Sequence, residues 1–123
     1  MKSSAHGFTL VELIITMVLI GIIATIAVPR FINLNASSNQ SATNAIATSL
    51  TAASASNYAQ RSANSSAGSA VSLCSSVTPL IAGGLPTGYS IHTNLAVPAG
   101  TSVNCKLDGP GSTQATFVAI GIA

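Results

Sequence analysis

Residues 8–28 form a continuous apolar run, FTLVELIITMVLIGIIATIAV, which restricts the possible folds more than any other part of the chain. A helix of these 21 residues is about 32 Å long, enough to cross the hydrocarbon core of a bilayer. Glu12 is the single charged residue within it. An acid at the centre of such a helix costs about 2.5–3.5 kcal/mol on insertion scales. The run therefore predicts a helix that can span a membrane, and its acid requires an explanation.

The rest of the chain is poor in charge, and this bounds its function. Charged residues make up 5% of the 123 residues, and the net charge is +2. So small an excess does not support nucleic-acid binding, which needs a strongly basic surface. Copies of a weakly charged protein repel one another little, so self-association is easy. Without residues 1–28, about 95 residues remain, enough for one small domain.

Four segments follow from the composition. Residues 1–7 are a polar leader, residues 8–28 are the apolar helix, residues 29–62 continue it as an amphipathic helix, and residues 63–123 are rich in Gly, Ser, Thr and Pro. We expect an α+β fold, in which the second half of a long N-terminal helix packs on a small antiparallel sheet. Gly21 lowers the helix propensity of the apolar segment, and Pro29 predicts a kink because it lacks an N–H.

Apolar residues recur at three- and four-residue spacing along the amphipathic segment, so one stripe is expected to face the sheet. Its members are Phe31, Leu34, Ala42, Ala45, Ile46, Leu50 and Ala53, with Ser38 in the gap.

Three strands are predicted after the helix, at Tyr89–Thr93, Thr101–Leu107 and Ala115–Ile122. The last is the most apolar, so it is expected to be the central or most buried strand. The turn residues 108–111, Asp-Gly-Pro-Gly, predict a hairpin between the last two strands.

Three interpretations of Glu12 compete. Thr9-Leu-Val-Glu12 matches a capping box at a helix start. The segment also has features of a secretory signal peptide, but its apolar core is longer than usual and Thr25-Ile-Ala27 is a poor cleavage site. Alternatively, cleavage between Gly7 and Phe8 creates an α-amine about 6 Å, or one helical turn, from Glu12. That amine is largely cationic at neutral pH, so a buried acid would gain a partner in its own or a neighbouring copy.

The segment Gly7-Phe8-Thr9-Leu10-Val11-Glu12, followed by the apolar helix and Pro29, resembles the type IV prepilin family of pilins and type II secretion pseudopilins. Residues 29–34, Pro-Arg-Phe-Ile-Asn-Leu, look most like pilins of the mannose-sensitive haemagglutinin type. The resemblance implies that a prepilin peptidase cleaves after Gly7 and N-methylates Phe8. It also implies that Glu12 neutralises the Phe8 amine of a neighbouring subunit, that Thr9 lies in the same assembly segment, and that the helix loosens between Gly21 and Pro29.

For the whole molecule, the resemblance implies a single-pass precursor in the bacterial inner membrane that lipid surrounds before assembly. An inner-membrane assembly platform then builds it, with copies of itself and minor pilins, into an extracellular or periplasmic filament. The alternatives are a type II secretion pseudopilin and a conventionally secreted small β domain that acts as a binding module. Asp108 is the one acid after Glu12, which disfavours the major pseudopilin with its acidic calcium loop.

Cys74 and Cys105 are expected to pair if the domain lies outside the cytoplasm, and to stay reduced in the cytosol. A bond between them closes a loop of about 30 residues and stabilises the fold by roughly 3–4 kcal/mol. The resemblance gives it a second role, as the border of the C-terminal loop that many type IV pilins carry.

No catalysis is expected. His92 and Asp108 with a serine lack the nucleophile elbow and second acid that would support a catalytic triad. His92 is expected in a strand and Asp108 in its turn. Two cysteines and two scattered histidines do not make a zinc site, so neither a metal nor a cofactor is expected.

Overall fold

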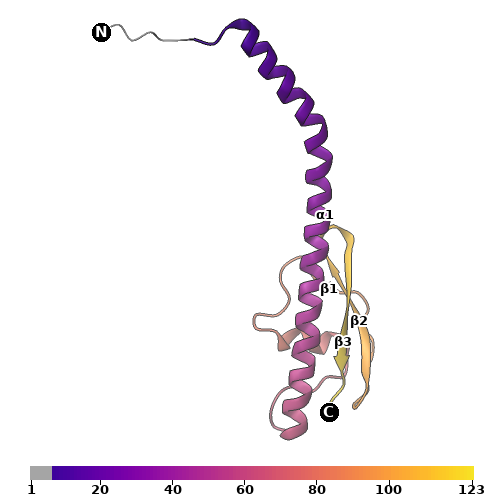
Figure 1. Ribbon diagram of the computed structural model, residues 1–123. Coiled ribbons are helices and arrows are strands. Elements are labelled where there is room, and N and C mark those ends of the chain that lie inside the picture. The colour runs from indigo at the N-terminus through magenta and orange to yellow at the C-terminus, as the bar shows by residue number, and fades with distance from the viewer. Residues whose placement is uncertain (1–6) are drawn as a thin grey trace, which may run out of the picture. The chain divides into compact units, whose positions relative to one another are not determined.

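The computed structural model describes residues 7–123, without the side chains of residues 31 and 32 (Figure 1). Within this range the predicted α+β class is confirmed. Residues 1–6 of the predicted leader lie outside the described residues, as does the side chain of Phe31. The elements are, in chain order, α1 (Leu10–Ala63), the 3-10 helix η1 (Cys74–Leu80), β1 (Ser90–Ile91), β2 (Ser102–Gly109), the 3-10 helix η2 (Pro110–Ser112) and β3 (Thr113–Ile120).

Helix α1 joins the apolar run and its amphipathic continuation in one element. The helix is continuous across Gly21 and Pro29, and the kink expected at Pro29 stays a prediction. The helix ends at Ala63, where the N–H of Asn64 still donates to the carbonyl of Gln60 at 2.9 Å. Asn64, Ser65, Ser66 and Gly68 follow, and these residue types favour a helix less than alanine does.

The chain divides into two compact units, and the division falls inside α1, between Asn35 and Ala36. In the first unit, described from Gly7, no described side chain is buried. The second unit, Ala36–Ala123, contains every buried residue of the described chain. A hydrophobic core therefore exists only in the second unit, which includes the last part of α1 as well as residues 63–123.

The sheet has the order β1-β2-β3, with both pairs antiparallel. Strands β2 and β3 form the predicted hairpin, paired from Ser102 with Ile120 to Gly109 with Thr113. Strand β1 is only two residues long, shorter than predicted. Of the two alternatives expected for β3, central or most buried, the second is confirmed: β3 is an edge strand, but it carries more buried residues than β1 or β2.

The edge of β3 is covered by polar side chains of α1, which explains how an apolar strand can lie there. The hydroxyls of Thr51 and Ser54 accept the N–H groups of Val118 and Ile120, at 3.0 and 2.8 Å. Gln40 Nε2 donates to the Gln114 carbonyl at 2.8 Å. An open strand edge presents unpaired backbone groups, and here α1 supplies their partners. Figure 1 shows this part of α1 alongside the sheet.

The face of α1 that packs on the sheet is rotated from the predicted stripe. Its fully buried row has spacings of four and three and consists of Thr43, Ala47, Leu50, Ser54 and Asn57. Of the predicted stripe, Leu50 is buried, Ile46 and Ala53 are half-buried, and Leu34, Ser38, Ala42 and Ala45 are exposed.

The prediction failed because it placed polar side chains in water, whereas those in the buried row have partners. Thr43 Oγ1 lies 2.7 Å from Thr113 Oγ1. Asn57 forms two hydrogen bonds of 2.8 Å with the backbone of Ser69, one as donor and one as acceptor. Burial of a polar group is tolerated when it is hydrogen-bonded.

Cys74 at the start of η1 and Cys105 in β2 form a disulfide, with Cα atoms 5.9 Å apart. Both residues are fully buried, in a core with Val77, Leu107 and Phe117. The sequence did not predict η1, because its residues, CSSVTPL, have no clear periodicity.

Candidate processing and assembly segment

Thr9 and Glu12 form the capping box that their spacing predicts. The backbone N–H and the hydroxyl of Thr9 donate to Glu12 Oε2 at 2.8 and 3.0 Å, and the N–H of Glu12 donates to Thr9 Oγ1 at 3.3 Å. The two residues thus satisfy each other at the start of α1, where backbone N–H groups lack helical partners. The Glu12 carboxylate also complements the positive end of the helix dipole. Within a single copy, Thr9 is the partner that holds this carboxylate.

Gly7 and Phe8 precede the first helical residue, Leu10, and both are exposed. The bond between them therefore lies in non-helical, accessible chain. A protease binds its substrate in an extended conformation, which makes this bond easier to reach than any within the helix.

The apolar run is exposed on every side of the helix. All fourteen large hydrophobic side chains of residues 8–28 have exposed fractions of 50–88%. Burying each one is worth about 1.5–3 kcal/mol, so covering the segment is worth tens of kcal/mol. A helix that is apolar all round belongs in a membrane or a larger core. The described chain has one helix long and apolar enough to cross a membrane, a property shared with signal sequences.

Two hydroxyls within the apolar run are satisfied inside the helix itself. Thr16 donates to the carbonyl of Leu13 at 2.8 Å, and Thr25 donates to that of Ile22 at 2.7 Å. Neither side chain therefore needs an outside partner in lipid or in a packed bundle. Glu12 remains the polar group that needs a partner in a dry environment.

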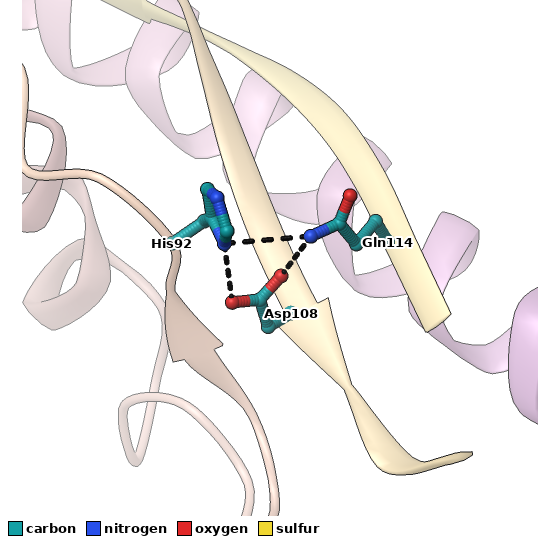
Figure 2. A network of polar contacts seen from close by, with 3 residues as sticks. All are labelled: His92, Asp108 and Gln114. Carbon is teal, nitrogen blue, oxygen red and sulfur yellow. Dashed lines mark hydrogen bonds and ion pairs between the residues drawn. The ribbon is translucent and has the colours of Figure 1, made fainter. Parts of the chain in front are cut away.

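The second unit brings together His92, which directly follows β1, Asp108 in β2 and Gln114 in β3 (Figure 2). His92 Nδ1 lies 2.8 Å from Asp108 Oδ2, and Gln114 Nε2 donates to Asp108 Oδ1, also at 2.8 Å. Since a carboxylate only accepts, Nδ1 of His92 carries the hydrogen. The sequence brought His92 and Asp108 together only in a triad that it did not support, and it placed Asp108 in the turn, whereas Asp108 lies in β2. Gln114 was missed, because the sheet register alone places it opposite Asp108.

These hydrogen bonds also affect the charge of Asp108. The hydrogen bond from His92 is the main cause that holds the pKa of the Asp108 carboxyl below its usual 3.8; desolvation opposes it, and Gln114 and the charges of His92 and Lys106 lower the pKa further by smaller amounts. Asp108 is therefore ionised at neutral pH. Among residues 7–123, no serine hydrogen-bonds to the His92 side chain, and a catalytic triad does not form.

The N-terminal segment matches known proteins. Residues 2–28 match the family described as the prokaryotic N-terminal methylation motif. Over 49 residues the chain is 49% identical to the type IV narrow pilus major component PilA5 of Thermus thermophilus. The match covers 40% of this chain and 42% of PilA5, so the chain spans less than half the length of this curated relative. No solved structure matches the chain.

Proposed function

We propose that the protein is a structural subunit of a type IV pilus-like filament, because residues 2–28 match the prokaryotic N-terminal methylation motif and part of the chain is similar to a type IV pilus component. The observation that carries the proposal is the methylation motif at the head of an apolar helix that is bare on all sides. Such a surface must be covered, and lipid before assembly and neighbouring helices afterwards both cover it.

In this proposal, a prepilin peptidase cleaves the precursor between Gly7 and Phe8 and methylates the new amine of Phe8. The accessibility of both residues ahead of the helix supports the site. The precursor spans the bacterial inner membrane once, through residues 8–28. Cleavage removes the polar leader, so the helix can leave the bilayer for a filament outside the cytoplasm.

Glu12 then pairs with the Phe8 amine of a neighbouring copy and sets the axial register of the filament. A carboxylate in a bundle of apolar helices is stable only with a cation or with hydrogen bonds. Thr9 holds Glu12 in the isolated subunit and supports the same arrangement. The partners are other copies of this chain, minor pilins, the peptidase and an inner-membrane assembly platform.

A pilus subunit is favoured over the other members of the family. The Cys74–Cys105 disulfide and the single acid of the second unit, Asp108, support a pilin rather than a major pseudopilin. The net charge of +2 does not support nucleic-acid binding. Among the described residues, no group of three or more His, Cys, Asp or Glu side chains could hold a metal ion for catalysis. The role that we propose is structural.

The mass of the mature N-terminus tests the processing step. Protein from sheared filaments and from membranes is digested, and the N-terminal peptide is sequenced by mass spectrometry. The expected peptide begins at Phe8 and carries one methyl group on its amine. A mature chain that begins near Val28, after cleavage at Ala27, would contradict the proposal and support a conventionally secreted domain.

Substitution of Glu12 tests the assembly step. Glu12→Gln keeps the shape and the capping oxygen but removes the charge, and Thr16→Ala is a control in the same apolar helix. We expect Glu12→Gln to abolish or strongly reduce filaments in electron micrographs while membrane-bound subunit persists, and Thr16→Ala to leave them unchanged. Normal filaments from Glu12→Gln would show that the cap, not the charge, is what matters.

A further inference from the structure

Asp108 is the one acid of the second unit, and its side chain is partly exposed. Only five residues after Gly7 are charged: Glu12, Arg30, Arg61, Lys106 and Asp108. The side chain of Asp108 is 34% exposed and that of His92 is 46% exposed. In a filament built from copies of one chain, the side-chain partner of any of these groups comes from the same short set, and Glu12 is already assigned to the Phe8 amine.

The surroundings of Asp108 are rich in acceptors. Its side chain lines an open pocket of about 360 Å³ with His92, Gln114 and the turn residues Gly109, Ser112 and Thr113. His92 and Gln114 already donate to the carboxylate from one side, which fixes its orientation. A group from another molecule can still donate hydrogen bonds to the remaining lone pairs of both carboxylate oxygens, to Nε2 of His92 and to Oε1 of Gln114. A planar guanidinium, with several N–H donors and a positive charge, matches such a pocket.

Arg30 lies just after the apolar run, and among residues 7–123 it and Lys106 are the cations without an ion pair or a side-chain hydrogen bond. Arg30 is exposed. In the bilayer, an arginine just beyond an apolar run reaches lipid phosphates. Once the apolar helix joins a bundle, those phosphates are lost, and a partly desolvated cation needs an acid.

The other cations are less suitable. Arg61 already donates to the carbonyl oxygens of Ala123 and Ala67, at 2.6 and 3.5 Å. Lys106 lies two residues from Asp108 on the same strand and the same outer face of the sheet. A Lys106–Asp108 contact between two copies is self-complementary and closes a dimer, whereas a contact between different surfaces can repeat along a filament.

We propose that Asp108 of one copy forms an ion pair with Arg30 of another copy in the assembled filament. The contact joins the end of the apolar segment of one subunit to the outer sheet face of its neighbour. His92 and Gln114 position the carboxylate for it. This inference rests on the proposed function, since it requires a filament.

A charge exchange tests the pair in cells that assemble the full-length protein. The variants are Arg30→Asp, Asp108→Arg and the two combined, and filaments are counted by electron microscopy. We expect each single reversal to lower filament number by about tenfold or more, because like charges then face each other. The double variant should recover at least a third of the filaments. Arg61→Gln and Lys106→Gln remove a cation without breaking the pair, and neither should change the count by more than about twofold.

Photocrosslinking tests the contact with both charges in place. p-Benzoylphenylalanine replaces Asn33, an exposed residue one turn after Arg30. Irradiated filaments should yield a covalent dimer, and mass spectrometry should place the crosslink within residues 106–114 of the second copy. A crosslink elsewhere would overturn the pairing, as would single reversals without effect.

The two proposals fail in different ways. If the wild-type protein forms no filaments, the proposed function is wrong. If it forms filaments that neither single reversal reduces, the function stands and the Arg30–Asp108 pair is wrong. Asp108→Arg also removes the bonds to His92 and Gln114, so membrane-bound subunit with an intact disulfide is checked for each variant. Arg30→Asp leaves the second unit untouched and decides the matter if Asp108→Arg is degraded.

Discussion

Ser54 is fully buried, although a serine on an amphipathic helix is expected to face water. Its hydroxyl accepts the backbone N–H of Ile120 at 2.8 Å, in the place that another strand would otherwise take. Thr51 does the same for Val118. These two side chains therefore lie against the sheet because their hydroxyls accept hydrogen bonds from the edge of β3. Their polarity alone would favour an exposed position.

Replacement of Ser54 by alanine should destabilise the second unit. The N–H of Ile120 then loses its acceptor in a buried place, which costs about 1–3 kcal/mol. Thermal unfolding of the full chain in detergent, followed by circular dichroism, measures the loss. Ser56→Ala, two residues on and exposed, is the control and should leave the midpoint unchanged. Equal midpoints for both variants would mean that the Ser54 bond adds nothing.

The network around Asp108 predicts a dependence on acid pH. The hydrogen bond from His92 lowers the pKa of Asp108 below 3.8, with Gln114 and Lys106 as the other groups facing it. The folded state therefore holds the carboxylate more strongly than the unfolded state does. Its contribution is present above pH 3.8 and is lost as the pH falls through the lowered folded value.

Comparison of Asp108→Asn with the wild type isolates this effect, because Glu12 is present in both proteins. The thermal midpoint of the wild type should exceed that of the variant at pH 7, and the gap should shrink as the pH falls below 3.8. A gap that stays constant with pH would show that the charge of Asp108 is not involved.

Apart from the Cys74–Cys105 disulfide, which two cysteines alone suggest, local contacts could be predicted from the sequence and distant ones could not. The Thr9–Glu12 cap follows from a spacing of three residues at a helix start, since helical geometry fixes the rest. His92, Asp108 and Gln114 meet because of strand register, which one sequence does not specify to the residue. The buried face of α1 was missed for the same reason: its polar members depend on partners up to 70 residues away.

At the scale of elements, the disulfide connects η1 to the central strand β2 across 31 residues. Neither η1 nor the loop between Leu80 and Ser90 pairs with a strand, and the two isolated bridges, Val71 with Ile122 and Leu73 with Ala96, lie outside both segments. The hairpin of β2 and β3 was predictable because its turn residues are local. The edge position of β3 was not, because it depends on how α1 covers the sheet.

Removal of the disulfide should cost about 3–4 kcal/mol of unfolding free energy, as expected for a loop of about 30 residues. The variant Cys74→Ala/Cys105→Ala avoids free thiols and is unfolded with guanidinium chloride in detergent alongside the wild type. A reducing agent that is present during unfolding and refolding should lower the stability of the wild type, because it breaks the disulfide. It should leave the variant unaffected. A double variant as stable as the wild type would rule out a structural role for the bond.

At the scale of the whole molecule, the two units differ in how far their side chains are buried. The buried side chains of the described residues all lie after Asn35, whereas the first unit exposes nearly all of its surface. The long helix and its apolar half were predictable from hydrophobic runs alone. The boundary between the units was not, since a helix does not reveal in its sequence where packing begins.

A fragment of residues 36–123 is therefore expected to fold without lipid or detergent. It should be monomeric in gel filtration, retain the disulfide, and give well-dispersed amide signals in NMR. The full chain under the same conditions should aggregate unless detergent is present. A disordered fragment would mean that residues 7–35 are needed for the core to form.

The covered edge of β3 has a consequence for storage. A precursor confined to a membrane is crowded in two dimensions, and an exposed strand at that density would recruit the next copy and build sheets that do not come apart. In this chain the hydroxyls of α1 occupy that edge, and the opposite edge is only two residues long. If the chain is the filament subunit proposed above, its copies can therefore be stored without pairing through their sheets, and association is left to the apolar helix.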